Sequence, residues 1–69
     1  MKNKWAQIAN QWDHFAVEAK KQWGELTDDE LMRVAGNRND LARFVQYRYF
    51  TTRKEAHDQI AVWMNALDI

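Results

Sequence analysis

The fold of this chain is decided by residues 23–36, WGELTDDELMRVAG. Thr27 is a typical helix N-cap, and Glu30, three residues later, completes the capping-box pattern T-x-x-E. Leu26, just before the cap, and Leu31, in the first turn of the predicted helix, have the spacing of a hydrophobic staple. Because these local signals agree with one another, the stretch predicts a tight corner between two helices.

Two helices flank this corner. Before it, large apolar residues recur every three or four positions, which predicts one long helix over residues 3–22. Gly24 then permits the chain to turn. After the cap, Gly36 is suited to the left-handed backbone conformation that ends many helices, so a short helix is predicted over residues 28–35.

The second half of the sequence predicts two more helices. One begins at residue 38 or 39 and ends at Tyr49, with Asn37 and Asn39 as alternative N-caps. The other follows Thr52, which forms a second capping box with Glu55. The apolar faces of the four helices predict one shared core, in which these residues are largely buried: Trp12, Phe15, Trp23, Leu31, Leu41, Val45, Ile60 and Trp63.

The composition favours a small helical domain. A length of 69 residues predicts a single domain comprising residues 1–69. Proline is absent and glycine occurs twice, which favours helices over a turn-rich β fold. Without cysteine, neither disulfides nor thiolate-bound zinc can stabilise so short a chain, so its nine aromatic residues must supply much of the core.

Nothing in the sequence predicts a membrane span or a signal peptide. The longest strictly apolar run is residues 60–64, far shorter than a bilayer requires. The first lysines precede no apolar segment, so we expect a cytoplasmic protein. Trp5, Trp12 and Phe15 share one helix face that could lie on a membrane surface, but the core requires the same face.

Several of these motifs together resemble the CsbD-like family of small bacterial general stress-response proteins. The resemblance covers residues 12–63 and depends on QWGELTDDEL at 22–31, Gly36, QYRY at 46–49 and Trp63. It implies an all-α fold, a compact bundle of four short helices arranged as two packed helical hairpins. It also implies induction during general stress, and it implies no catalytic residue and no cofactor.

The chain departs from the pattern that this resemblance implies. Ala16, Arg43 and Phe50 stand where glycines are expected, and Tyr47 stands where an acidic residue is expected. The departures replace small or charged residues by larger or aromatic ones. A function that depends on a strongly hydrated surface is therefore less well supported for this chain than for its relatives.

The sequence offers little for catalysis or metal binding. It contains no cysteine and no serine, and its three threonines are explained as helix caps and a loop residue, so we expect no enzymatic activity. His14 with Glu18, and His57 with Asp58, supply two ligands each, whereas a tight metal site requires three or four. We therefore expect no metal and no other cofactor.

A candidate contact surface lies on and after the third helix, and it comprises Arg43, Tyr47, Phe50 and Arg53. On a helical wheel Arg43 and Tyr47 lie opposite the buried face, and Phe50 follows close behind. Phe50 is either exposed beside Tyr47 or tucked beneath the fourth helix, and the sequence leaves both open. Exposed aromatic residues beside arginine are typical of binding hot spots.

Two functions are compatible with this surface. The first is a non-enzymatic stress-response protein that acts through its folded surface, by protein contact or in a protective role. The alternative is a nucleic-acid-associated module, since residues 37–54 carry five basic residues, one acidic residue and interleaved aromatics. The 10 basic and 10 acidic residues of the chain cancel, which favours the first. We expect a monomer.

Overall fold

The computed structural model describes residues 4–69, and this part of the chain is all-α, with no β-strand. It contains five helices: α1 (Lys4–Asn10), α2 (Trp12–Gln22), α3 (Asp28–Val34), α4 (Arg38–Tyr49) and α5 (Arg53–Ala66). The predicted all-α class is confirmed, but the prediction of four helices is wrong for the described residues. The predicted helix start at Asn3 lies outside them.

The additional helix arises because the predicted helix over residues 3–22 is interrupted at Gln11. The backbone of Gln11, with φ −124° and ψ 42°, leaves the helical region. Its N–H donates to the carbonyl of Ile8 at 3.2 Å, which closes α1 with a tighter turn. Its own carbonyl accepts the N–H groups of His14 and Phe15, so α2 begins at once.

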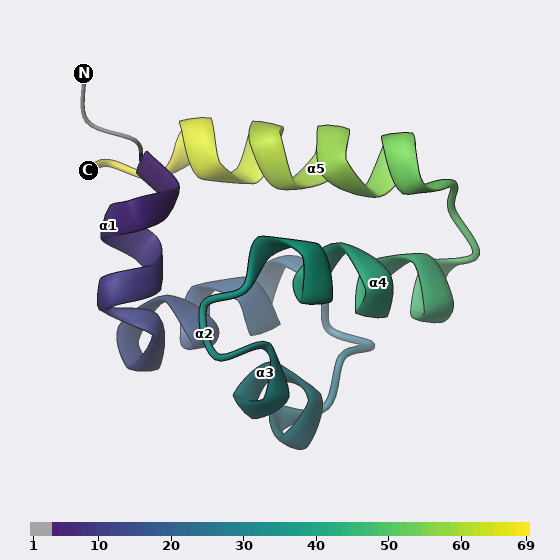
Figure 1. The fold of residues 1–69 in the computed structure, drawn as a ribbon, viewed down its shortest axis with the longest axis horizontal. Helices are drawn as coiled ribbons and strands as arrows, with labels where there is room; N and C mark the ends of the chain where they lie inside the picture. Colours follow the sequence, from purple (N-terminus) through teal and green to yellow (C-terminus); the bar gives the residue numbers. More distant parts are fainter. Residues whose placement is uncertain (1–3) are drawn as a thin grey trace.

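The bend returns α1 to the rest of the molecule. A straight helix over these residues would extend for about 30 Å and carry Trp5 away from the core. Instead, α1 lies crosswise at one end of the bundle (Figure 1). There the Trp5 indole N–H donates to the carbonyl of Gly36 at 2.9 Å, and its ring lies 6.5 Å from that of Trp63. Tertiary contacts therefore outweigh the continuous helical pattern of the sequence.

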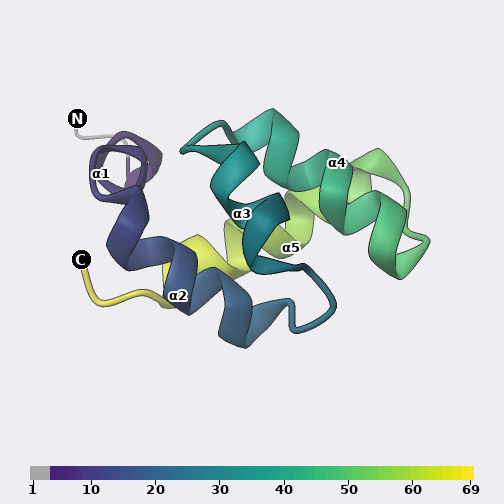
Figure 2. The same ribbon diagram turned by 90° about the horizontal axis from the view of Figure 1, so that it is seen from below.

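Consecutive helices contact one another along the chain. The helices α4 and α5 lie side by side and run in opposite directions (Figure 1), while α2 passes along the other side of the bundle (Figure 2). The predicted corner after α2 brings α3 back against it. The described residues thus form a compact bundle with a radius of gyration of 11.0 Å.

The core confirms all eight residues predicted from periodicity, each of which is less than 9% exposed. The core also includes six further residues: Ile8, Ala19, Leu26, Val34, Ala42 and Ala56. Trp23 and Trp63 meet near edge-on, with ring centroids 5.3 Å apart. The Trp23 indole N–H donates to Gln59 Oε1 at 3.0 Å, so the ring is buried without losing its hydrogen bond.

The helix starts follow the predicted caps. Both capping boxes, Thr27 with Glu30 and Thr52 with Glu55, are present with both of their hydrogen bonds. The N-cap that the sequence left open is Asn37, whose side chain accepts a backbone N–H three residues later at 3.1 Å. Side chains therefore satisfy backbone donors at the starts of α3, α4 and α5.

Candidate functional site

The predicted contact surface comprises Arg43, Tyr47, Phe50 and Arg53, and all four residues are exposed. Arg43 and Tyr47 lie one turn apart on α4 and line a groove of about 490 Å³ between α3 and α4. Phe50 and Arg53 do not line this groove, because they follow in the turn after α4 and at the first residue of α5. The structure thus brings two of the four residues into one hollow.

The exposure of Phe50 answers the question that the sequence left open. The helix ends at Tyr49, and Phe50 is the C-cap, with φ 55° and ψ 43° in the left-handed region. Its side chain is 94% exposed, so it is not tucked beneath α5. A left-handed conformation costs a residue with a Cβ about 1–2 kcal/mol, which is why glycine usually takes this position.

Tyr47 is the second large apolar side chain on this surface, at 72% exposed. The guanidinium carbon of Arg48 lies 5.5 Å from the centre of its ring, within the range of a cation–π contact. Most of the ring nevertheless stays open to solvent.

Arg48 also forms an ion pair with Glu30 on α3. Its Nε and Nη2 atoms donate to the Glu30 carboxylate at 3.0–3.2 Å in a bidentate arrangement. These bonds from Arg48, followed by the backbone N–H of Thr27, lower the pKa of Glu30 below its ordinary value of 4.5. The Glu30 carboxylate that binds Arg48 is 18 residues away along the chain, while the arginine itself is exposed.

Most other basic residues near α4 also have acidic partners. Arg33 pairs with Asp29 at 3.1 Å, and Lys54 pairs with Asp58 at 3.0 Å. Arg43 forms a longer contact of 3.8 Å with Asp40, and its side chain is 79% exposed. Within residues 4–69, Arg53 forms no ion pair. The two arginines of the predicted contact surface, Arg43 and Arg53, are therefore not held by a close ion pair.

The histidine pairs considered from the sequence do not assemble into larger clusters. Among the described residues, no three histidines, cysteines or carboxylates lie close enough together to hold a metal ion. His14 instead packs edge-on against the ring of Phe15, with the centroids 4.9 Å apart. The described part of the molecule thus presents surfaces and grooves as its candidate sites.

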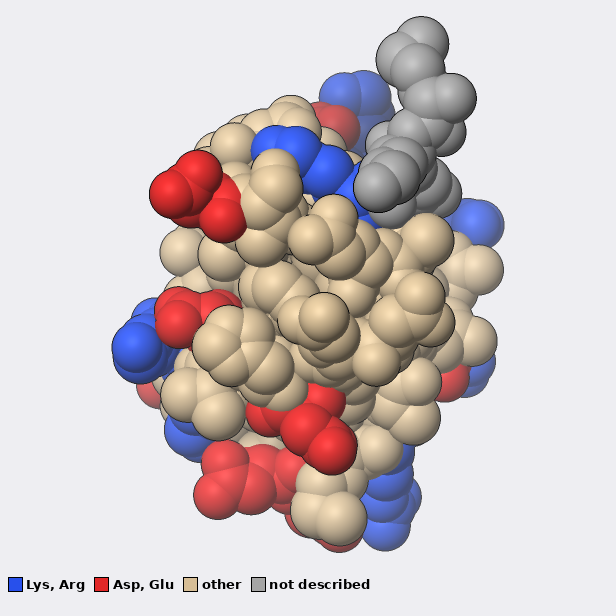
Figure 3. Space-filling model, turned by 90° about the vertical axis from the view of Figure 1, so that its left-hand side faces the viewer, with Lys and Arg blue, Asp and Glu red and all other residues tan. Residues whose placement is uncertain are grey.

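The membrane-surface interpretation of the first helix fails on burial. Trp12 and Phe15 are only 8% and 4% exposed, and Trp5 packs against the core. Figure 3 shows the end of the molecule that carries α1, where uncharged side chains fill the centre and charged ones lie mainly near the edge. The aromatic face predicted for a bilayer therefore points inward. None of the helices within residues 4–69 is long and apolar enough to cross a bilayer.

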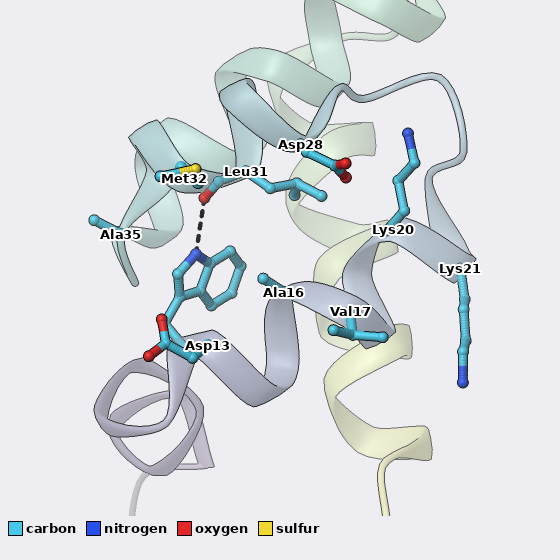
Figure 4. Close-up of a pocket in the computed structure, with 10 residues that line it drawn as sticks. Asp13, Ala16, Val17, Lys20, Lys21, Asp28, Leu31, Met32 and Ala35 are labelled. Atoms are coloured by element: carbon cyan, nitrogen blue, oxygen red, sulfur yellow. Dashed lines mark hydrogen bonds between the residues drawn. The ribbon is translucent and has the colours of Figure 1, made fainter.

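A second groove, which the sequence did not predict, lies between α2 and α3 and has a volume of about 620 Å³ (Figure 4). We call it the α2–α3 groove. Trp12 and Leu31 contribute to its wall, and the Trp12 indole N–H donates to the carbonyl of Leu31 at 2.8 Å. Val17 and Met32 also line it, although both are outside the predicted apolar faces. In the sequence, these two apolar residues outside the predicted apolar faces were the only indication of the groove.

The fold and its surfaces define a small helical-bundle protein with a candidate contact surface. Three relatives identify its family. The chain is 43% identical over 53 residues to a UPF0337 protein of Bordetella pertussis, and these residues cover 77% of this chain and 80% of the relative. It is 37% identical over 57 residues to a UPF0337 protein of Pectobacterium atrosepticum, covering 83% of each chain. It is 35% identical over 52 residues to the UPF0337 protein YjbJ of Escherichia coli, covering 75% of each.

The chain therefore belongs to the UPF0337 family, which is CsbD-like, and the resemblance seen in its motifs is confirmed. No family model matches the sequence. No solved structure is detectably similar to the described fold.

Proposed function

We propose that this protein catalyses no reaction and acts as a small stress-response protein in the bacterial cytoplasm, where it binds a partner protein through Arg43, Tyr47, Phe50 and Arg53. The observation that carries the proposal is the position of Phe50. Its ring is 94% exposed at a backbone conformation that favours glycine, so two unfavourable features coincide in one residue. Because the side chain is almost fully exposed, few contacts within the described residues can offset them.

The neighbouring residues support a protein partner. Tyrosine and arginine are enriched among the residues that dominate binding energy, and Tyr47 presents most of its ring to solvent. Arg43 has only a weak contact with Asp40 at 3.8 Å, so its guanidinium is available to a carboxylate of a partner. The surface therefore combines two aromatic anchors with two available cations.

The alternative is a nucleic acid bound by the same residues, and Arg43 and Arg53 are the observation in its favour. A chain with 10 basic and 10 acidic residues has no net charge to attract phosphates over a distance. In addition, Arg33, Arg48 and Lys54 are already paired with carboxylates. We therefore favour a protein partner.

Photo-crosslinking in stressed bacterial cells tests this choice. A photoreactive p-benzoyl-phenylalanine placed at position 47 is expected to capture a discrete partner protein. Capture should be lost when the same chain carries Arg43→Glu or Phe50→Gly. Val62 is 71% exposed on α5 and gives a matched control, since Val62→Glu should leave capture unchanged. Equal capture by all variants, or none by any, would contradict the proposal.

Titration of labelled DNA and RNA separates the two candidates. Phosphate contacts release counterions, so nucleic-acid binding should weaken steeply with salt, with a slope of about −0.9 per contact on duplex DNA. We expect no salt-sensitive binding in the micromolar range. Tight, salt-sensitive binding that Arg43→Ala and Arg53→Ala both weaken would establish the alternative in place of the protein partner.

A further inference from the structure

The α2–α3 groove presents apolar side chains to solvent. Val17 is 58% exposed and Met32 is 75% exposed, although both line the groove. Ala16 and Ala35 also line it, and their small side chains leave room for another helix to approach closely. The groove therefore offers apolar contacts to a helix that carries an apolar ridge of its own.

Two of the charged residues that line this groove, Asp13 and Lys21, flank Val17 on α2. Asp13, Val17 and Lys21 follow one another at intervals of four residues on α2, and Figure 4 shows them in this order along the helix. With a rise of 1.5 Å per residue, Asp13 lies about 6 Å before Val17 and Lys21 about 6 Å after it. One apolar residue thus stands midway between a negative and a positive charge.

We propose that the α2–α3 groove binds a second copy of this chain, with the two α2 helices antiparallel across a two-fold axis at Val17. In this arrangement Asp13 of each copy faces Lys21 of the other, and the two Val17 side chains meet. A two-fold interface must be its own complement, and this ridge is complementary to itself only when antiparallel. Charge complementarity therefore selects a second copy over an unrelated helix.

The other charged groups around the groove are compatible with this pairing. Lys20 is already engaged, because its Nζ donates to the carbonyls of Gly24 and Leu26. Asp28 lies in the first turn of α3, where the helix dipole stabilises its charge. Asp13 forms no ion pair within residues 4–69, so its carboxylate is free to meet a second copy.

Lys21 requires only a small change to take part. Its contact with Glu18 is 3.7 Å long, and the lysine side chain is 70% exposed. Such an exposed pair has little strength, so Lys21 can exchange Glu18 for Asp13 of the second copy. Helices that pack through residues four apart cross at an angle, and the length of a lysine side chain spans the resulting gap. The expected dimer has a small interface and dissociates reversibly. This proposal differs from the monomer predicted from the sequence.

A charge-swap experiment tests the arrangement by sedimentation velocity at increasing protein concentration. The wild-type chain is expected to dimerise. Asp13→Lys alone places lysines opposite each other, and Lys21→Asp alone places aspartates opposite each other, so each variant should self-associate at least about tenfold more weakly. An equimolar mixture of the two should recover dimerisation, because both contacts are then lysine–aspartate pairs.

The recovery in the mixture is the decisive outcome. Both residues are exposed, so the variants should keep the helical circular dichroism of the wild type. A monomeric wild type at all concentrations would overturn the proposal. Single variants that dimerise as well as the wild type, or a mixture that stays monomeric, would do the same.

Disulfide trapping tests the position of the axis independently. The chain has no cysteine, so a single introduced thiol can only bond to its counterpart in another copy. Helix axes about 8–10 Å apart leave facing backbones within the reach of a disulfide at the axis. Val17→Cys should therefore form a disulfide dimer rapidly under mild oxidation, whereas Val62→Cys on α5 should do so slowly, although Val62 is the more exposed of the two at 71% against 58%. Equal rates for the two variants would overturn the proposed axis.

Discussion

The guanidinium of Arg48 and the carboxylate of Glu30 form a bidentate pair, with Nη2 and Oε2 3.0 Å apart. The same carboxylate accepts the backbone N–H of Thr27 at 2.9 Å and so completes the capping box of α3. One side chain therefore joins the start of α3 to the last turn of α4. Glu30, which marks the start of α3 in the sequence, therefore also links α3 to α4 in the fold.

This dual role predicts a pH dependence. The pKa of Glu30 is lowered in the folded protein by Arg48 and then by the backbone of Thr27, so its stabilisation is present above pH 4.5, the ordinary pKa. It is lost as the pH falls through the lowered value. Glu30→Gln should therefore melt at a lower temperature than the wild type at about pH 7, and the difference should shrink as the pH falls below 4.5. Glu25→Gln, which removes an exposed carboxylate from the same corner, is the control. A difference that is independent of pH would contradict the assignment.

We predict that the position of Gly36 does not tolerate a side chain. Its φ is +83°, and an added Cβ would lie 3.1 Å from the Cβ of Ala9 in α1. Gly36→Ala should destabilise the fold by about 1–2 kcal/mol through the left-handed backbone alone. The melting temperature should fall by about 4–8 °C per kcal/mol in a domain of this size. Gly24→Ala is the matched control, because its Cβ would meet nothing within 4 Å and it should melt at or above the wild-type temperature.

Substitution of Thr27 should measure how much one helix N-cap contributes to the stability of the fold. Thr27→Ala removes the hydroxyl that accepts the Glu30 N–H at 3.1 Å, and it should cost about 1 kcal/mol in chemical denaturation. Thr27→Ser keeps this acceptor and should lose much less. If the alanine and serine variants had the same denaturation midpoint, the hydroxyl would not be the source of the stability.

We predict that replacing Phe50 by glycine stabilises the fold. Phe50→Gly removes the strain of a Cβ at φ 55° and loses few contacts, because the ring is almost fully exposed. Glycine makes the unfolded chain more flexible, which offsets part of this gain, so we expect a net stabilisation of about 0.5–1 kcal/mol. Phe50→Ala keeps the Cβ and should show no such gain in thermal melting. A glycine variant that is no more stable than the alanine variant would show that the backbone is not strained.

We predict that the core does not tolerate the loss of the Trp63 ring. Its ring packs against Trp5 and Trp23 and is 6% exposed. Trp63→Ala should cost about 3–5 kcal/mol, which is enough to unfold a small domain with little stability to spare. Trp63→Phe retains an aromatic ring and should unfold cooperatively at a lower denaturant concentration than the wild type. A folded alanine variant with native circular dichroism would contradict this role.

The sequence by itself determined the local features of this protein. Thr27 and Thr52, each followed three residues later by glutamate, identified two helix starts because a capping box is formed by residues adjacent along the chain. The spacing of apolar residues identified the buried positions for the same reason, since every helix turns at a known rate. The exposure of Arg43, Tyr47 and Arg53 was also predictable, because it depends on which face of a helix is buried.

Only the tertiary structure decided the features that join distant segments. The break at Gln11 exists because Trp5 reaches Gly36, 31 residues away, and the apolar pattern continues through it unchanged. The pair of Glu30 and Arg48 spans 18 residues and has no spacing that a helical pattern would reveal. The α2–α3 groove forms from residues of two helices that meet only when the chain folds back. Caps and periodicity are properties of neighbouring residues, whereas bends, cross-helix ion pairs and grooves depend on which distant surfaces pack together, and that packing is settled by the whole core at once.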